Sequence, residues 1–325
     1  PRQFYTGTFA YAGQLIWEGP IPKASSNISL IPYISGGAFE DREVDPTDSS
    51  TELQTGFDAK VSISPSMNLD LTVNPDFSQI EVDEQILNLS RFEFRFPERR
   101  QFFLENSDLF DNAGFDSARP FFSRRIGIIQ DSTGIPQKVP IMYGARLSGT
   151  INEKWRLGVM NMHTKKMLEL GLPAQNYTVA TVQRMFHEQS SFSMTFVNKE
   201  SLGVTENDSL KYYHPSIFGR PTLEDRLRPN TYNRVLDADL VLRSKDNRWY
   251  HSSFLAQSFD NRNKAKTMSG SAFFQYSDRS LLANLGAFFV DKNFNAEVGY
   301  VPGSMVYPGQ MGYYSEVAYK IYPEN

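Results

Sequence analysis

Four carboxylates lie close together in the sequence, at Asp76, Glu81, Asp83 and Glu84, and they are the first candidates for chemistry. Carboxylate oxygens are the ligands that Ca²⁺ prefers in proteins, so these residues are a candidate calcium site. Their spacing does not fit the helix–loop–helix calcium loop, which needs Asp-x-Asn-x-Asn-Gly followed by a Glu. Ca²⁺ is the one candidate cofactor, and we expect none to be resident.

The same stretch of chain is rich in arginine, and ion pairing is the alternative use of its acids. The expected network consists of Arg91, Glu93, Arg95, Glu98, Arg99, Arg100, Glu105, Arg124 and Arg125. A buried acid–base network can fix one packing of a segment that has too little apolar area to fix itself, although such pairs need not add stability. We favour this structural use of the charges over a metal site.

Enzymatic sites find less support in the sequence. The carboxylates could form a glycosidase pair, but nothing places two of them at the required separation. His251 and Ser253 share one face of an expected strand and could begin a serine-hydrolase site, yet no oxyanion hole can be located. We therefore expect a non-enzymatic protein, with a hydrolase acting on glycans or lipids as the alternative.

Composition excludes several further classes. The 325 residues carry 33 basic and 37 acidic side chains, interspersed and with a formal charge of −4, so we expect no nucleic-acid partner. The absence of cysteine excludes disulfides, thiolate catalysis and zinc–thiolate sites. No stretch approaches the ~20 consecutive apolar residues that a membrane-spanning helix needs.

The elements that must position these residues are strands, joined alternately by short and long connections. Tight polar turns are expected at residues 64–66, 152–154, 187–189, 245–247 and 277–279. Long segments lie near residues 37–50, 75–139, 164–174, 200–230 and 302–310. Short turns at one rim and long loops at the other are typical of an antiparallel barrel that spans a bacterial outer membrane.

Apolar and polar residues alternate with a period of two in several runs, which indicates β-strands. Phe57, Ala59, Val61 and Ile63 are one such run. The expected strands cover residues 4–10, 24–35, 51–63, 67–74, 140–151, 155–163, 175–186, 190–199, 231–243, 249–259, 267–276, 281–290, 294–301 and 311–322. Many of these runs exceed the ~5–6 residues usual in globular sheets and fit the ~9–11 that cross a bilayer at a tilt.

The sequence thus predicts an all-β fold, an antiparallel transmembrane β-barrel of about fourteen strands or part of a larger one. We expect residues 1–325 to form one barrel domain that is incomplete at one or both ends, because residues 321–325 lack the terminal aromatic typical of a finished outer-membrane barrel. A soluble β-sandwich is the alternative, because its strands alternate in the same way.

Residues 75–139 are too long for an ordinary loop and too patterned to be disordered. Phenylalanines and paired charges follow one another closely along this segment, which suggests a compact element with a small core of its own. We expect it to fold into the lumen of the barrel as a plug, or to cap one rim.

Several long strings in the chain carry a resemblance to a known family. They are NPDFSQIEVDEQILNLSRFEFRFPERRQFFLENSDLF at 74–110, RPFFSRRIG at 119–127, SNISLIPYISG at 26–36, PIMYGARLSGTI at 140–151, LPAQNYTVATVQR at 172–184 and NFNAEVGYVP at 293–302. In these strings the chain resembles a family of Bacteroidota envelope proteins. Members pair an N-terminal family-9-like carbohydrate-binding module with a C-terminal domain of unknown function that is predicted to be a barrel. The resemblance implies location and architecture, and the module is absent from this chain.

The expected function is therefore docking or passage at the bacterial outer membrane. The protein would be a docking subunit of an envelope complex, or a conduit for substrate. Its partners would be outer-membrane lipid and lipopolysaccharide, further envelope proteins and, through the missing N-terminal module, a glycan. A filled lumen would favour docking, and an open lumen would favour conduction.

Overall fold

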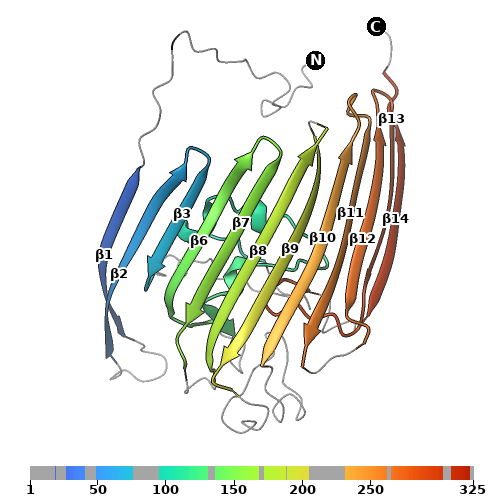
Figure 1. Ribbon diagram of the computed structural model, residues 1–325. Coiled ribbons are helices and arrows are strands. Elements are labelled where there is room, and N and C mark those ends of the chain that lie inside the picture. Colours follow the sequence, from blue (N-terminus) through green and yellow to red (C-terminus); the bar gives the residue numbers. More distant parts are fainter. Residues whose placement is uncertain are drawn as a thin grey trace.

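The computed structural model of the protein describes Gly19 and residues 27–40, 49–75, 95–130, 136–167, 172–187, 189–204, 231–261, 265–302 and 309–322. Within these residues the chain forms one large sheet of 12 strands (Figure 1). The strands are β1 (Ile28–Glu40), β2 (Ser49–Ser64), β3 (Met67–Val73), β6 (Ile141–Asn152), β7 (Trp155–Thr164), β8 (Ala174–Phe186), β9 (Ser190–Leu202), β10 (Tyr232–Arg243), β11 (Trp249–Asp260), β12 (Met268–Ser277), β13 (Leu281–Val290) and β14 (Gln310–Tyr319). Each strand pairs antiparallel with the next in this order.

The connections alternate in length, as the sequence predicts. Tight turns join β2 to β3, β6 to β7, β8 to β9, β10 to β11 and β12 to β13, all at one rim of the sheet (Figure 1). His187 and Asn247 adopt positive φ angles of 47° and 58° in two of these turns, a conformation that asparagine tolerates better than most residues. The longer connections lie at the opposite rim, which we call the long-loop rim.

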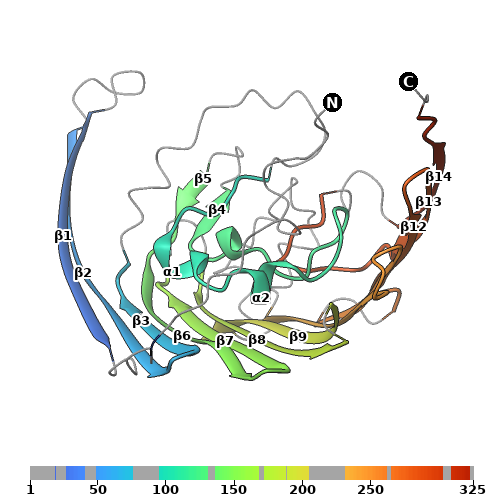
Figure 2. The ribbon, with the colours of Figure 1, turned by 90° about the horizontal axis from the view of Figure 1, so that it is seen from above.

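The sheet is strongly curved but open. Seen from above, its strands line a trough whose concave side holds α1 and α2, while β1 and β14 stand far apart at its two edges (Figure 2). The expectation of a closed ring of about fourteen strands is thus not met by the described residues, in which 12 strands form an open sheet. One expected strand, 4–10, lies outside the described residues, and another, 294–301, takes a different structure.

The segment 294–301 alternates like a strand, but it runs inside the trough. Phe294, Ala296 and Val298 are buried in the core, which explains the alternation. The backbone of the segment does not pair with a strand of the sheet. Instead Arg119 and Tyr300 exchange two backbone hydrogen bonds, and the Phe122 amide donates to the Val298 carbonyl at 2.7 Å. The alternation of apolar residues shows which side chains are buried, but it does not show which segment pairs with their backbone.

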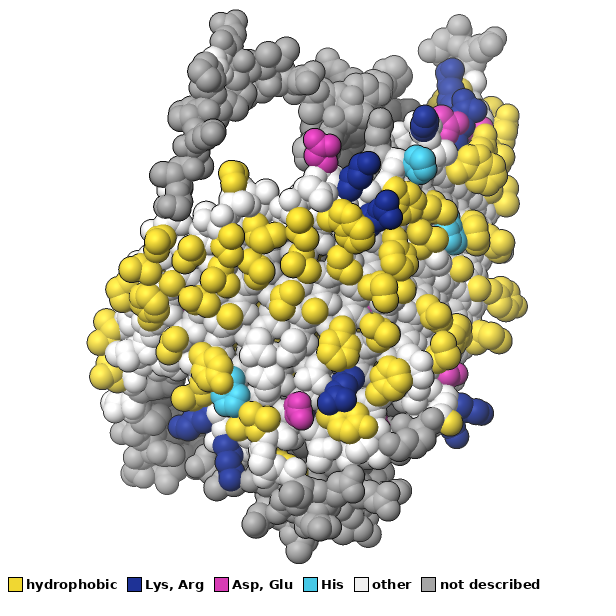
Figure 3. Space-filling view, viewed as in Figure 1, with side chains coloured by type: hydrophobic (Ala, Val, Ile, Leu, Met, Phe, Trp, Pro, Cys, Tyr) yellow, Lys and Arg dark blue, Asp and Glu magenta, His cyan; other side chains and the backbone are white. Residues whose placement is uncertain are grey.

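Both sides of the sheet carry apolar residues, but on the convex side they are exposed. On β10, Leu236, Ala238, Leu240 and Leu242 face the convex side, while Asp237 and Asp239 face the trough among the core residues. The convex side exposes large apolar residues on nearly every strand, among them Ile34, Leu53, Phe196, Leu236, Leu255, Leu285 and Val317. Figure 3 shows this apolar belt across the convex face, with charged side chains gathered toward the two rims. A water-soluble antiparallel sheet usually has one apolar face against the core and one polar face in water, whereas here the outer face is apolar as well.

The described strands of the large sheet form one layer, whereas a β-sandwich requires two sheets packed face to face. None of the described helices has the length and apolarity that a membrane-spanning helix requires.

Candidate functional site

The concave side of the sheet is occupied by the insert, the described part of the β3–β6 connection. It contains two short helices, α1 (Gln101–Leu104) and α2 (Asp108–Asp111), a 3₁₀ turn, η3 (Ser123–Arg125), and a hairpin of β4 (Ile128–Gln130) with β5 (Pro136–Lys138). Figure 2 shows the helices inside the trough. The candidate site is this interface between insert and sheet.

Apolar contacts make up the centre of the interface. Phe103, Leu109, Phe110, Phe121 and Ile126 of the insert form one core with residues of the sheet such as Met160, Val179, Val197, Val235 and Phe254. Gly158 of β7 makes room for the Phe110 ring, since a Cβ atom there would lie 2.7 Å from it. The fit indicates an insert docked at one fixed position.

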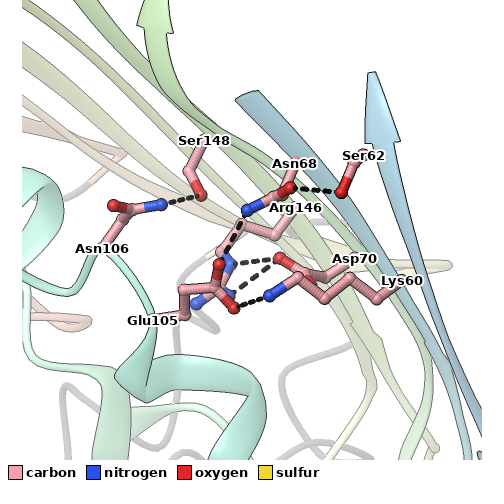
Figure 4. A network of polar contacts seen from close by, with 8 residues as sticks. All are labelled: Lys60, Ser62, Asn68, Asp70, Glu105, Asn106, Arg146 and Ser148. Atoms are coloured by element: carbon pink, nitrogen blue, oxygen red, sulfur yellow. Dashed lines mark hydrogen bonds and ion pairs between the residues drawn. The ribbon is translucent and has the colours of Figure 1, made fainter. Parts of the chain in front are cut away.

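Polar contacts hold the insert at the β2–β3–β6 side of the trough, as Figure 4 shows. Glu105, just after α1, pairs with Lys60 of β2 and accepts a hydrogen bond from Asn68 of β3 at 2.8 Å. Asn106 donates to the Ser148 hydroxyl of β6 at 3.1 Å. Partial burial raises the pKa of Glu105, but the hydrogen bonds and charge of Lys60 outweigh it and hold that pKa below its ordinary range.

A buried ion pair of the wall lies beside these contacts. Arg146 of β6 donates from Nη2 to Asp70 Oδ2 of β3 at 2.8 Å, and only 2% of the arginine side chain is exposed. Its guanidinium carbon also lies 5.2 Å from the centre of the Phe102 ring. The pair therefore contacts the insert as well as joining two strands.

A second buried pair closes the insert on itself. Arg100 donates to Glu98 at 2.6 and 2.8 Å, and its other donors reach the carbonyl oxygens of Ile126 at 2.6 Å and Ser123 at 2.8 Å. Burial raises the pKa of Glu98, but the hydrogen bonds and charge of Arg100 outweigh it and leave that pKa below its ordinary value. One arginine thus ties the start of the described insert to its η3 turn.

The remaining residues of the expected charge network take varied partners. Arg124 donates to the Pro97 carbonyl at 3.2 Å, and Arg125 donates to the Gly299 carbonyl at 2.9 Å. Arg95 lies 5.5 Å from the Phe122 ring, and the Arg99 amide donates to Glu98 at 3.0 Å. Asp76, Glu81, Asp83, Glu84, Arg91 and Glu93 lie outside the described residues, so the structure does not place the candidate calcium ligands. Elsewhere in the described chain, no group of three His, Asp or Glu residues could hold a metal ion.

Sequence reasoning missed a second inward segment, 291–301 of the β13–β14 connection. Glu297 of this segment forms an ion pair with Lys199 of β9, with 2.9 Å between Lys199 Nζ and Glu297 Oε2. Asn233 of β10 donates to the Asn295 carbonyl at 2.9 Å and accepts from the Glu297 amide at 3.0 Å. Through the Arg119–Tyr300 bridge, the insert and this segment form one body inside the trough.

The family described as Domain of unknown function (DUF5916) matches residues 25–209, more than half of the chain. The chain belongs to this family. No curated protein matches it. The matched residues include β1 to β9 and the whole insert. The contacts of Glu105 and Asn106 with β2, β3 and β6 therefore lie within the family segment. The bacterial group and the sugar-binding module implied by the sequence resemblance stay predictions.

Two neighbouring acids on the concave side of β10 have side-chain oxygens that lack a hydrogen-bond partner among the described residues. Asp237 is only 2% exposed, and neither of its carboxylate oxygens accepts a hydrogen bond. Asp239 accepts one from the Gly114 amide at 3.3 Å, and its Oδ2 has no partner. These acids lie where the β10 wall meets the insert.

The histidine and serine considered for hydrolysis lie elsewhere. His251 and Ser253 of β11 face the convex side, opposite Leu242 and Leu240 of β10. The His251 ring packs 4.2 Å from that of Phe274, and its Nδ1 lies 3.1 Å from the Phe273 carbonyl oxygen. The cross-strand neighbours of this pair are the apolar residues Leu242, Leu240, Phe274 and Ala272.

Proposed function

We propose that this protein is the wall of an outer-membrane β-barrel whose lumen is filled by its own chain, and that it acts as a docking subunit of an envelope complex. The observation that carries the proposal is the apolar belt of the convex side, where large apolar residues are exposed on nearly every strand, while buried charges such as Asp70 and Arg146 face the trough. The proposed location is the bacterial outer membrane.

Energetics supports hydrocarbon as the neighbour of the convex face. Monomeric soluble proteins rarely expose apolar patches above a few hundred Å². Here Leu53, Val317 and Tyr313 are 75%, 77% and 89% exposed, and similar residues recur around the whole face. Contact with lipid chains removes this surface from water at a gain of roughly 25 cal/mol per Å².

The two sheet edges support a larger closed ring. β1 and β14 each have a neighbouring strand on one side only within the described part of the chain. An unpaired edge cannot remain in hydrocarbon, because each orphaned backbone group there costs several kcal/mol. Further strands, or closure of β1 toward β14, would complete the barrel.

The filled trough supports docking over conduction. An open conduit needs a continuous water-filled lumen, whereas here the insert and segment 291–301 pack on β7 to β11 through a shared apolar core. Ion pairs fasten both segments to the wall, Glu105 to Lys60 and Glu297 to Lys199. A body anchored on two sides is suited to presenting a fixed surface to a partner protein.

Membrane insertion is tested by refolding into phosphatidylcholine vesicles. We expect the protein to float with the vesicles in a density gradient and to migrate faster on a detergent gel before boiling than after. Recovery of the folded protein in the vesicle-free fraction would contradict the proposal.

Docking and conduction are separated by conductance in planar bilayers. Asn106→Cys with Ser148→Cys would allow the insert to be locked to β6, because these side chains are in contact and the chain has no other cysteine. We expect the same low conductance in the oxidised and reduced states. Large openings on reduction would favour a conduit.

Purification of the protein from native membranes would identify the docked partner. If no partner protein co-purifies, docking is contradicted.

A further inference from the structure

A polar patch interrupts the apolar belt on the convex face, toward the long-loop rim. It consists of Asn161, Asn176, Thr178, Asn198 and Arg234. In the register of β7 to β10, Asn161 lies opposite Thr178, Thr178 opposite Asn198, and Asn198 opposite Arg234. Four of the five residues therefore form one row across four strands.

The amide residues of the patch are ordered by hydrogen bonds to one another. Asn161 donates to Asn176 Oδ1 at 2.9 Å and to the Thr178 hydroxyl at 2.8 Å. Asn176 donates back to Asn161 Oδ1 at 3.1 Å. The result is a fixed polar surface on a face that otherwise consists mainly of apolar side chains.

Arg234 is held on two sides, which leaves its outer end available. Its Nε donates to Asn198 Oδ1 at 2.9 Å, and its guanidinium carbon lies 4.6 Å from the centre of the Tyr232 ring. Among the described residues, neither of its two terminal amino groups has a hydrogen-bond acceptor. A planar guanidinium held in this way presents the fork that binds a phosphate through two parallel hydrogen bonds.

We propose that Arg234 and this patch bind the phosphate of an anionic lipid headgroup, in the leaflet at the long-loop rim. The inference rests on the proposed function, since it requires a membrane around the belt. Next to the patch lie Phe196 and Leu236, which are 38% and 44% exposed. Glu200 lies on the rim side of the patch, opposite Asn176 and Tyr232, so Arg234 is the group that selects an anion. An occupant that covers both surfaces must be apolar along the belt and must offer an anionic group to the Arg234 fork, and an anionic lipid has both parts.

Arg184 offers a matched control at the opposite rim. It also lies on the convex face, and its guanidinium carbon is 5.5 Å from the Trp155 ring. The structure gives it this aromatic contact without a side-chain hydrogen bond like that of Arg234 to Asn198. The two arginines therefore share charge and stacking, and they differ in the anchored fork.

The test compares wild type, Arg234→Ala, Arg234→Lys and Arg184→Ala in phosphatidylcholine vesicles with and without lipid A. Native mass spectrometry of the extracted protein measures how much lipid A it retains. We expect Arg234→Ala to bind lipid A at least ~10-fold more weakly, because it loses a charge-assisted bidentate contact. Arg234→Lys should be intermediate, and Arg184→Ala should match wild type.

Equal losses in Arg234→Ala and Arg184→Ala, or no loss in Arg234→Ala, would overturn the proposed site. Vesicle flotation and heat-modifiable migration are recorded for every variant to show that it is folded and inserted. If all the proteins float but Arg234→Ala retains as much lipid A as wild type, the headgroup site is wrong, whereas the proposed membrane location is not contradicted. If none floats, the proposed function and the headgroup site are both wrong.

Discussion

Arg119 of the insert and Tyr300 of the β13–β14 connection exchange two backbone hydrogen bonds, each of 2.9 Å. These residues are far apart in the chain, and their pairing joins the two inward segments into one body. Arg125 strengthens the joint by donating to the Gly299 carbonyl at 2.9 Å. The stability of the filled trough should therefore depend on this short stretch of backbone.

Gly299→Ala should weaken the joint. An added Cβ would overlap the Arg119 carbonyl oxygen and lie 2.8 Å from that of Pro120. We expect the free energy of unfolding to fall by about 1–3 kcal/mol, as for other overpacked sites. Urea unfolding of the refolded protein in vesicles measures it. Gly286→Ala is the control, because the atom closest to its Cβ would belong to the movable Phe273 ring, at 3.2 Å, and the nearest backbone atom, the Ala272 carbonyl oxygen, lies at an ordinary contact distance of 3.7 Å. Equal effects of the two variants would contradict the role of the joint.

Arg146→Met should be strongly destabilising, because it leaves Asp70 as a buried charge without its arginine. Removing one partner of a buried pair typically costs about 3–5 kcal/mol. Replacing both partners, in Arg146→Met with Asp70→Leu, should recover most of that loss. The control is Arg156→Met, whose ion pair with Asp108 is far more exposed and should be worth at most about 1 kcal/mol. Urea unfolding of the three variants measures their free energies of unfolding. If Arg146→Met loses no more stability than the control Arg156→Met, the prediction is wrong.

Asp237→Asn should stabilise the protein. The Asp237 side chain is 2% exposed and lies beside Asp239, and its oxygens have no hydrogen-bond partner, so ionising the acid there costs free energy that an amide of the same shape, which does not ionise, avoids. We expect a gain of about 1–3 kcal/mol in the free energy of unfolding. The contrasting variant is Asp278→Asn in the β12–β13 turn, which removes the charge that accepts from the amides of Ser280 and Leu281 at 2.8 and 2.7 Å. That variant should lose stability, and a loss in both would contradict the interpretation of Asp237.

The sequence predicts the strands well because each convex-facing side chain meets the same environment. Phe57, Ala59, Val61 and Ile63 reveal β2 through alternation alone, since the strand expected at 51–63 is observed at Ser49–Ser64. The strand expected at 24–35 lies further along the chain, at Ile28–Glu40. The same rule fails at 294–301, because the interior of the trough buries alternate residues as effectively as a sheet does. The alternation also says nothing of which strands lie at the edges of the sheet, so it does not predict that the sheet is open between β1 and β14.

The contacts of the candidate site could be predicted only in part. Glu98 and Arg100 are two residues apart, and their pairing is accessible from the sequence. Lys60 with Glu105, Asp70 with Arg146 and Lys199 with Glu297 join segments brought together by the curvature of the sheet. Spacing in the sequence carries no information about such pairs. Lys60, Asp70 and Arg146 lie in the middle of β2, β3 and β6. The alternation identifies such charges as facing away from the apolar side of a strand, although it does not identify their partners.

Asp111→Asn should change how stability depends on pH. Burial raises the pKa of Asp111 from 3.8 to about 6, although Arg95 and Arg119 oppose the shift and Glu98 adds to it. The folded protein therefore binds more protons than the unfolded chain between these two values, and this residue lowers stability as pH rises through that window. Asp111→Asn removes the effect, so its advantage over wild type should grow from near zero at about pH 4 to at most about 3 kcal/mol above pH 6. Urea unfolding across this range checks it, and a difference independent of pH would contradict it.

Arginine substitutions along β9 test the proposed membrane around the belt. Met194 and Glu200 both face the convex side, but Met194 lies within the apolar belt and Glu200 lies toward the long-loop rim, one strand from Tyr232. An arginine facing lipid at the midplane of an outer-membrane barrel costs about 2–4 kcal/mol, whereas one near the interface costs about 0–1 kcal/mol. Met194→Arg should therefore be the more damaging change for unfolding from vesicles, while Glu200→Arg should be nearly neutral. In a water-exposed sheet the ranking would disappear, because an arginine at either position would be solvated equally well, so equal stabilities of the two variants would contradict a membrane around the belt.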